Sequence, residues 1–509
     1  MSQNTTEVIY SAIPSQAVFP LPTSLIVEEL EGLYGAAVLA EMAEILTYYD
    51  IYDHGAKFFT DSKGDYTPSD LRYKEARKLI NKEARFLFSK PPDMKVEVPY
   101  DRDNPAAKET ASAQMSVLQS YIDNVFDSTD FVAKLVKAAK DCFVGKRVAY
   151  FVNFDENKQR VTVDFVPSLE FVYETDPEDV TQLTKIVTFY QTNDTATRTD
   201  QRIYKKKYWM QNGVCWIAEA IYDGTGALVE ELTPDRATRL NFIPAGVILN
   251  DGLTGDVQGQ SEIESLADYE SWFSRLANAD IDAERQGMNP VRYAIDINPD
   301  TTTNLSLAAG SFWDLQSDPN GAEAKTGTVG VLETSMGYTT AVNSTLSRLR
   351  STMLEELDIP DVSAEALKGV VSSGKTLKAI YWSLIVRCDE KMLAWRPALR
   401  GLTKALIEGG RAYPLSAAPY TTEPLPDVEY TIIVDNQYPL PDDEADEKTL
   451  DMSEVNNQIM SRKAYLKKWR GLTDEEANQE LQQIALEREM LENSYGAMPP
   501  WRGTEEQEE

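Results

Sequence analysis

A glycine- and serine-rich segment in the second half of the chain holds the residues best suited to chemistry. Residues 369–376 read Gly-Val-Val-Ser-Ser-Gly-Lys-Thr and fit the phosphate-binding expression G-x-x-x-x-G-K-[ST]. In that motif, backbone N–H groups surround the phosphates of a nucleotide, the lysine contacts them and the hydroxyl group binds Mg²⁺. Taken alone, the segment predicts a P-loop NTPase.

The elements around this motif do not supply the context that a P-loop requires, which is a buried strand before it and a helix after it. The apolar spacing from Thr376 onward predicts the helix. The segment before Gly369 holds Pro360 and acidic and small residues instead of a Val/Ile run. Residues 432–435, Ile-Ile-Val-Asp, match the acidic companion motif only formally, because they follow a proline-rich segment. We therefore interpret Gly369 and Gly374 as hinges of a helix–loop–helix and keep the NTPase as the alternative.

Charge and composition limit the other classes of site. The chain has 50 basic and 82 acidic residues and a net charge of −32, which argues against a protein that grips DNA by neutralising many phosphates. It does not argue against a conduit along which DNA slides. The one histidine, His54, lies in an expected surface turn and leaves no basis for a histidine-based metal site. We expect no cofactor and no metal.

The cysteines and the apolar runs indicate the environment in which the protein works. Three cysteines lie far apart, each in an apolar stretch, and predict buried free thiols: Cys142, Cys215 and Cys388. No apolar run has membrane-spanning length, and the first residues lack the basic segment of a secretory signal. We expect a protein without a membrane partner.

The first half of the chain predicts helices followed by strands. Apolar residues three or four apart predict helices over 24–49, 67–89, 111–125 and 130–143. The period then changes to two, which predicts strands over 148–153, 161–166, 171–174, 186–191, 202–209, 214–220 and 228–230. Lys205, Lys206 and Lys207 lie on one of these strands, and we interpret them as protection of a sheet edge.

The second half predicts two long antiparallel helices around a small insertion. Ser261-x-x-Glu264 is a capping box that opens a helix to about Gln286, and a returning helix covers residues 337–357. A strand over 291–297 and an apolar segment at Phe312–Trp313 lie between them. After the loop, Pro397 should kink or split the next helix, and 428–434 is a lone strand. The tail is helical, and Thr473-x-x-Glu476 caps its last helix.

Five short motifs occur in a fixed order over residues 48–492. They are a helix ending at a Pro turn (81–92), Gly145-Lys-Arg-Val-Ala-Tyr-Phe-Val, Gly259-Gln-Ser-Glu-Ile-Glu, Asp358-Ile-Pro-Asp with Ser373-Gly-Lys-Thr-Leu-Lys, and Ile459-Met-Ser-Arg-Lys-Ala-Tyr-Leu. In this order they resemble the motifs of tailed-bacteriophage portal proteins, the siphovirus-type head–tail connector portals. Thr376 stands where that family has a small apolar residue, and this substitution creates the P-loop match.

The resemblance implies a fold class of α+β, predominantly helical, with a wing, a two-helix stem, a clip, a tunnel loop and a helical crown. It implies assembly as a ring of about twelve copies. The boundaries that we expect are an N-terminal arm (1–23), a wing (24–255, with a β-rich region at 148–230), stem helices (256–286 and 336–358), a clip (287–335), a tunnel loop (359–374), a long kinked helix with a wing strand (375–440), crown helices (441–494) and a disordered acidic tail (495–509).

The same resemblance implies a function, partners and candidate sites. The ring would lie at one capsid vertex of the virion, after assembly in the host cytoplasm, and would pass double-stranded DNA without sequence specificity during packaging and ejection. Its partners would be the large terminase, head-completion or adaptor proteins, and the major capsid and scaffolding proteins. The candidate DNA-facing residues of the tunnel loop are Lys368, Gly369, Ser372, Ser373, Gly374 and Lys375, and the candidate docking residues of the clip are Asn289, Arg292, Phe312 and Trp313.

Overall fold

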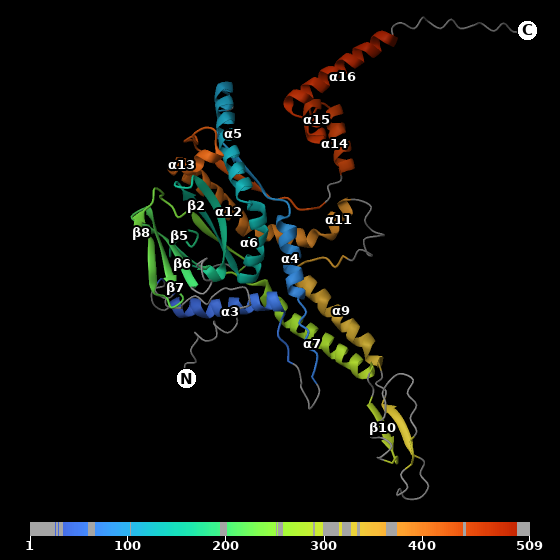
Figure 1. Cartoon of the computed structure of the whole chain (residues 1–509). Coiled ribbons are helices and arrows are strands. Elements are labelled where there is room, and N and C mark those ends of the chain that lie inside the picture. The colour runs from blue at the N-terminus through green and yellow to red at the C-terminus, as the bar shows by residue number, and fades with distance from the viewer. Residues whose placement is uncertain are drawn as a thin grey trace, which may run out of the picture. The chain divides into compact units, whose positions relative to one another are not determined.

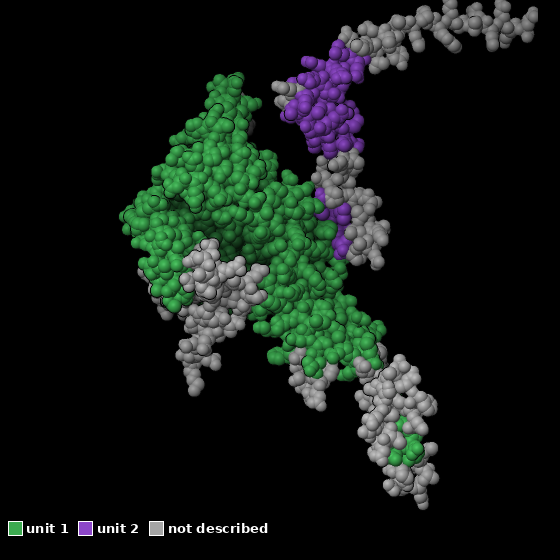
Figure 2. Space-filling view, viewed as in Figure 1, with its two compact units in different colours: residues 1–361, 381–439 green, residues 362–380, 440–509 purple. Residues whose placement is uncertain are grey.

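The protein is described here by a computed structural model. It covers residues 26, 29, 34–59, 67–101, 103–193, 201–250, 252, 258–288, 291–298, 315–317, 327–332, 336–362, 374–440 and 444–495. The chain divides into two compact units, drawn in different colours in Figure 2. Unit 1 consists of residues 1–361 and 381–439, and unit 2 of residues 362–380 and 440–509.

Unit 1 combines helices with antiparallel sheets (Figure 1). Its α-helices in the described ranges are α3 (Tyr34–His54), α4 (Glu75–Phe88), α5 (Pro105–Ser128), α6 (Phe131–Gly145), α7 (Glu262–Met288), α9 (Thr339–Glu356), α12 (Trp382–Ala412) and α13 (Pro414–Ala417). Its strands there are β1 (Asp93–Glu97), β2 (Arg147–Asp155), β3 (Arg160–Pro167), β4 (Phe171–Thr175), β5 (Leu183–Asn193), β6 (Gln201–Gln211), β7 (Val214–Asp223), β8 (Leu228–Ala237), β9 (Ala245–Leu249), β10 (Val291–Ile295), β11 (Thr328–Leu332) and β12 (Thr431–Asp435). The mixed, largely helical fold class expected from the sequence is confirmed.

The β-rich region forms two sheets that face a common core. Strands β4 to β8 make a five-stranded antiparallel meander, and β3, β2 and β9 make a second sheet. Phe151 of β2 packs against Tyr208 of β6, with ring centroids 6.4 Å apart, inside a buried cluster that also holds Phe171 and Cys215. The period-two pattern predicted these strands except β9, whose short sequence Ala-Gly-Val-Ile-Leu does not alternate.

The lysines on β6 do not protect a sheet edge, so that interpretation is wrong. Strand β6 lies between β5 and β7 inside the five-stranded sheet. Lys205 and Lys207 point to one face and pair with Glu29, at 2.6 and 2.8 Å. Lys206 points to the other face, where it pairs with Glu219 at 3.3 Å. The alternation of the strand therefore sends its three cations to two separate acids.

The start of α4 and the course of α12 at Pro397 differ from the sequence prediction. Residues 67–74 are not helical, and α4 begins at Glu75. Helix α12 is not split at Pro397, since it continues from Trp382 to Ala412. Pro397 is exposed, so the carbonyl group of Leu393, which loses its helical partner, lies on the solvent side of the helix. The break in this region falls at the turn residue Tyr381 instead.

Strand β12 contains Asp435, the acidic residue of the segment that formally matched the companion motif of a P-loop. It pairs antiparallel with β1, with Asp435 opposite Asp93 and Val434 opposite Met94. All strand pairs among the described residues are antiparallel. The described part of the chain therefore contains no parallel sheet of the kind that carries a P-loop.

Unit 2 is helical where it is described. It contains α11 (Gly374–Ile380), α14 (Glu444–Asn456), α15 (Arg462–Arg470) and α16 (Asp474–Tyr495). The predicted capping box is present, because Thr473 N donates to Glu476 Oε2 at 2.9 Å and Glu476 N donates to Thr473 Oγ1 at 3.4 Å. Asp451 of α14 accepts a hydrogen bond from Trp469 Nε1 at 2.8 Å, which ties α14 to α15.

Candidate functional site

Helices α7 and α9 form an antiparallel pair that ends in a small two-stranded sheet (Figure 1). Tyr269 Oη, near the start of α7, donates to Glu356 Oε1, at the end of α9, at 3.5 Å. At the other end, β10 follows α7 and pairs antiparallel with β11, with Val291 opposite Leu332. The pair thus carries the sheet of β10 and β11 at the end opposite Tyr269 and Glu356.

The start of α7 is fixed by a serine and a glycine of the third sequence motif. Ser261 Oγ accepts from Ile263 N at 3.2 Å and donates to Val144 O, at the end of α6, at 2.6 Å. Gly259 has a φ of +75°, and a Cβ there would lie 2.4 Å from Lys146 O. Only glycine fits this position, because any other side chain would meet backbone in a disfavoured conformation.

A row of polar side chains along α7 holds the segment before α4. Leu71 N donates to Asn278 Oδ1 at 2.9 Å, and Asn278 Nδ2 donates to Leu71 O at 2.7 Å. Ser274, Asp282 and Glu270 accept further backbone N–H groups of residues 69–76. These four acceptors recur every fourth residue on α7, and they satisfy backbone groups that a helix would otherwise pair internally. This explains why residues 67–74 are not helical.

The sequence reasoning missed this row. Its signal is the four-residue spacing of polar side chains on a face of α7 where burial would favour apolar ones. Glu270 and Ser274 are fully buried. Burial raises the pKa of Glu270 to about 7, although its Oε2 accepts from Ala76 N at 3.1 Å.

A buried cluster of charges, which we call the junction cluster, joins three helices. It consists of Glu83 of α4, Glu262 in the first turn of α7, and Arg387 and Lys391 of α12. Lys391 Nζ lies 2.5 Å from Glu262 Oε1 and donates to Asn250 Oδ1 at 2.9 Å. Arg387 Nε donates to Glu83 Oε1 at 2.8 Å, and its Nη2 donates to Glu262 Oε1 at 3.2 Å.

The two carboxyl groups of the junction cluster differ in pKa. Burial, and then the neighbouring Glu262 charge, raise the pKa of Glu83 to about 8. Burial also acts on Glu262, but Lys391 and Arg387 outweigh it and lower the pKa of that carboxyl group. At neutral pH, Glu83 therefore holds a proton while Glu262 is ionised, and the two cations are shared mainly by one carboxylate.

The residues beside the junction cluster hold the end of α9. Arg387 Nη1 donates to Glu356 O at 3.5 Å, and Ser383 Oγ donates to Asp358 O at 3.2 Å. Lys82 Nζ of α4 donates to Pro360 O at 3.4 Å. Helices α4 and α12 therefore fix the chain as far as Pro360, just before the glycine- and serine-rich segment.

The predicted site residues fall mostly outside the described ranges. Outside them lie Lys368, Gly369, Ser372 and Ser373 of the predicted tunnel loop and Asn289, Phe312 and Trp313 of the predicted clip, as do the N-terminal arm and residues 496–509 of the tail. Gly374 and Lys375 are the first two residues of α11. Arg292 lies on β10 opposite Val331.

Cys142, Cys215 and Cys388 are buried and free, as predicted. Among the residues with described positions, no three His, Cys, Asp or Glu side chains gather as metal ligands would. No described helix is long and apolar enough to cross a membrane.

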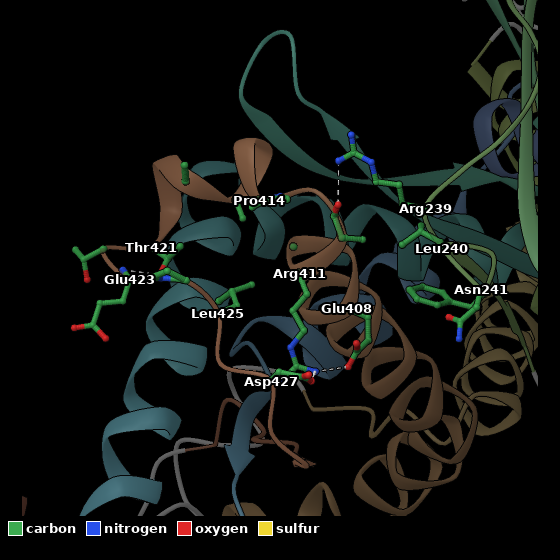
Figure 3. Close-up of a pocket in the computed structure, with 17 residues that line it drawn as sticks. Arg239, Leu240, Asn241, Glu408, Arg411, Pro414, Thr421, Glu423, Leu425 and Asp427 are labelled. Carbon is green, nitrogen blue, oxygen red and sulfur yellow. Dashed lines mark hydrogen bonds and ion pairs between the residues drawn. The ribbon is translucent and has the colours of Figure 1, made fainter.

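A pocket of about 1070 Å³ lies between α12, α13 and the segments around Arg239 and Asp427 (Figure 3). Arg411 Nη1 lies 2.9 Å from Glu408 Oε1 and 4.0 Å from Asp427 Oδ1. Arg239 Nη1 pairs with Glu156 at 2.9 Å. Both arginines that line the pocket are therefore already paired with acids.

Comparison with known proteins gives a family match over most of the chain. A family model described as phage portal protein, SPP1 Gp6-like, matches residues 37–494. No curated protein matches the sequence. Among the solved structures that match is a chain of the "neck of native GTA particle computed with C12 symmetry", at 8% identity and a TM-score of 0.31, covering 77% of this chain and 88% of that chain. A likeness at this level supports no argument about function.

Proposed function

The chain belongs to the family of SPP1 Gp6-like phage portal proteins, and from this membership we propose that it forms the ring through which phage DNA enters and leaves the capsid. The observation that carries the proposal is the family match over residues 37–494, which includes both compact units. Membership of this family implies a component of the virion. The ring would contain about twelve copies, in line with the closed symmetry of most homo-oligomers.

The described elements suit the parts of such a ring. We assign α7 and α9 to the stem, β10 and β11 to the clip, and α14 to α16 to the crown. The wing would comprise α3 to β9 together with β12. The tunnel loop would be residues 359–374, whose first residues are held by α4 and α12 through Pro360 and Asp358.

The proposed partners follow from the same role. The clip would dock the large terminase during packaging and then head-completion or adaptor proteins, and the wing would meet major capsid and scaffolding proteins. Double-stranded DNA would pass through the channel without being read. Phage portal proteins are structural in general, and we propose that this chain has no catalytic activity of its own.

The P-loop alternative gains no support from the described residues, since β12 is antiparallel to β1. An ATPase assay separates the two functions. ATP turnover that Lys375→Ala abolishes would replace the portal proposal with the NTPase.

The test of the proposed function is the native mass of the purified full chain by mass photometry, with negative-stain images of the same sample. We expect closed rings of about a dozen subunits with a central hole. If the isolated chain stays monomeric, the same measurement is repeated on material co-expressed with capsid and scaffolding proteins. Absence of rings in both samples would overturn the proposal.

A further inference from the structure

Four cationic side chains gather on the adjoining surfaces of α4 and α6, a surface that we call the α4–α6 patch. Arg77 and Arg85 lie two turns apart on α4, and Lys137 and Lys140 lie one turn apart on α6. The two helices pack against each other, and they lie side by side in Figure 1. In a chain with 82 acidic and 50 basic residues, a surface where four cations outnumber the two neighbouring acids, Asp53 and Asp141, requires an explanation.

The cations of the α4–α6 patch are poorly neutralised. Arg77 lies 3.5 Å from Asp53 Oδ1, and both side chains are partly exposed, so this pair is weak. Arg85, Lys137 and Lys140 make no ion pair with any described acid. Burial, and then the charges of Arg85 and Arg77, lower the pKa of Lys140. Like charges therefore repel one another here in the isolated chain.

The composition of the patch distinguishes a phosphate surface from a protein interface. Protein–protein interfaces have an apolar and aromatic centre. Within its described residues, α4 exposes no large hydrophobic side chain, and α6 exposes only Val132, which precedes the patch. Contacts to a nucleic-acid backbone come instead mainly from arginine and lysine.

We propose that the α4–α6 patch binds the phosphate backbone of duplex DNA without reading its sequence. This inference depends on the proposed function, because that function is what brings DNA to the protein. Arg77 and Arg85 are separated by about 12 Å along the helix, a length over which a DNA strand presents several phosphates. One copy would bind weakly, and the copies of a ring would bind together by avidity.

The proposal also explains how an acidic protein can contact DNA locally. A net charge of −32 repels the duplex from most of the surface. The excess positive charge of the α4–α6 patch would then favour one position of the duplex, and weak local attraction within general repulsion would let the duplex slide.

The test compares two variants that remove the same number of charges. The patch variant is R85Q/K137Q/K140Q, which spares Arg77 because its guanidinium lies over the Tyr52 ring at 5.1 Å. The control variant is K57Q/K95Q/K158Q, whose three lysines are exposed and each pair with a nearby aspartate. Both variants change the net charge by three. A difference in DNA binding between them therefore depends on where the charges lie and not on the total charge.

Binding of a labelled 30-base-pair duplex is measured by fluorescence anisotropy between 25 and 200 mM NaCl. Loss of three phosphate contacts should reduce the slope of log K against log salt by about 2.7 and the affinity at low salt by about tenfold or more. The control variant should stay within about twofold of the wild type, because general charge alone changes weak binding little. Equal losses in the two variants, or no loss in the patch variant, would overturn the proposal.

Two further measurements keep the outcome interpretable. Binding of poly-glutamate is measured for the same variants, and if the patch variant loses poly-glutamate binding but keeps duplex binding, the surface serves an acidic protein and the proposal fails. Mass photometry of each sample reports ring formation separately. Rings that form in the wild type without patch-dependent DNA binding would contradict this inference alone, whereas absence of rings bears on the proposed function.

Discussion

Lys391 Nζ of α12 lies 2.5 Å from Glu262 Oε1 in the first turn of α7, in the interior of unit 1. The carboxylate also benefits from the N-terminal end of α7, where the helix dipole favours negative charge. This contact joins the start of the proposed stem to the helix that follows the proposed tunnel loop. Four ionisable groups from α4, α7 and α12 meet here, so the junction cluster fixes how these three helices lie within unit 1.

Removing one cation from the junction cluster should be strongly destabilising. Lys391→Met removes the shortest contact of Glu262 and leaves Asn250 Oδ1 without its donor, and we expect the free energy of unfolding to fall by about 2–3 kcal/mol. Urea denaturation followed by circular dichroism measures the loss. The double variant K391M/E262Q also takes the ionised partner from Arg387 and should be less stable than the single variant. A single variant as stable as the wild type would contradict the inferred importance of the cluster.

The raised pKa of Glu83, about 8 in the folded chain, makes stability depend on pH. Below the ordinary carboxyl pKa both states are protonated, whereas between about pH 5 and pH 8 the folded state holds a proton that the unfolded state has lost. Stability should therefore fall as pH rises through this window, by at most about 1.4 kcal/mol per pH unit for this group.

Glu83→Gln tests this pH dependence, because glutamine keeps the shape of the protonated acid and does not titrate. We expect a shallower decrease of the unfolding free energy between pH 5 and pH 8 in the variant, measured by urea denaturation across that range. Glu270, whose pKa is raised to about 7, contributes in the same direction and keeps part of the slope. An identical slope in wild type and variant would show that Glu83 does not titrate in this window.

Asn278→Ala should release the segment before α4. The substitution leaves the N–H and C=O groups of Leu71 without their partners, which we expect to cost about 2–3 kcal/mol. Hydrogen exchange read by mass spectrometry should show faster exchange over residues 67–76. Gln286→Ala, at an exposed position of the same helix, is the control and should leave exchange unchanged. Unchanged exchange in Asn278→Ala would contradict the role of the polar row on α7.

Lys368→Ala and Lys375→Ala test whether the predicted tunnel loop contacts DNA. If these lysines contact phosphates, each substitution should reduce DNA packaging or retention without changing ring assembly, because it removes a cation and leaves the packed elements intact. A packaging assay with nuclease protection measures the DNA, and mass photometry measures the ring. The hypothesis fails if packaging and retention are unchanged in both variants.

Local patterns in the sequence were sufficient for most elements. Alternation predicted β2 to β8, and three- or four-residue spacing predicted α5, α6, α7 and α9, because the periodicity of a strand or a helix is a property of neighbouring residues. The capping box at Thr473 and the burial of the cysteines were predicted for the same reason. The order of short motifs indicated the family that the family model then matched.

Only the tertiary structure decided the features that depend on residues far apart in the chain. The start of α4 at Glu75 depends on acceptors of α7 about two hundred positions later, and Lys205 and Lys207 of β6 depend on Glu29. Nothing in the sequence links Glu83 with Arg387, although Arg387 Nε lies 2.8 Å from Glu83 Oε1 in the fold. Propensity and periodicity describe a segment and its own neighbours, whereas a buried charge is stable only where the fold brings its partner, and the linear sequence does not state that pairing.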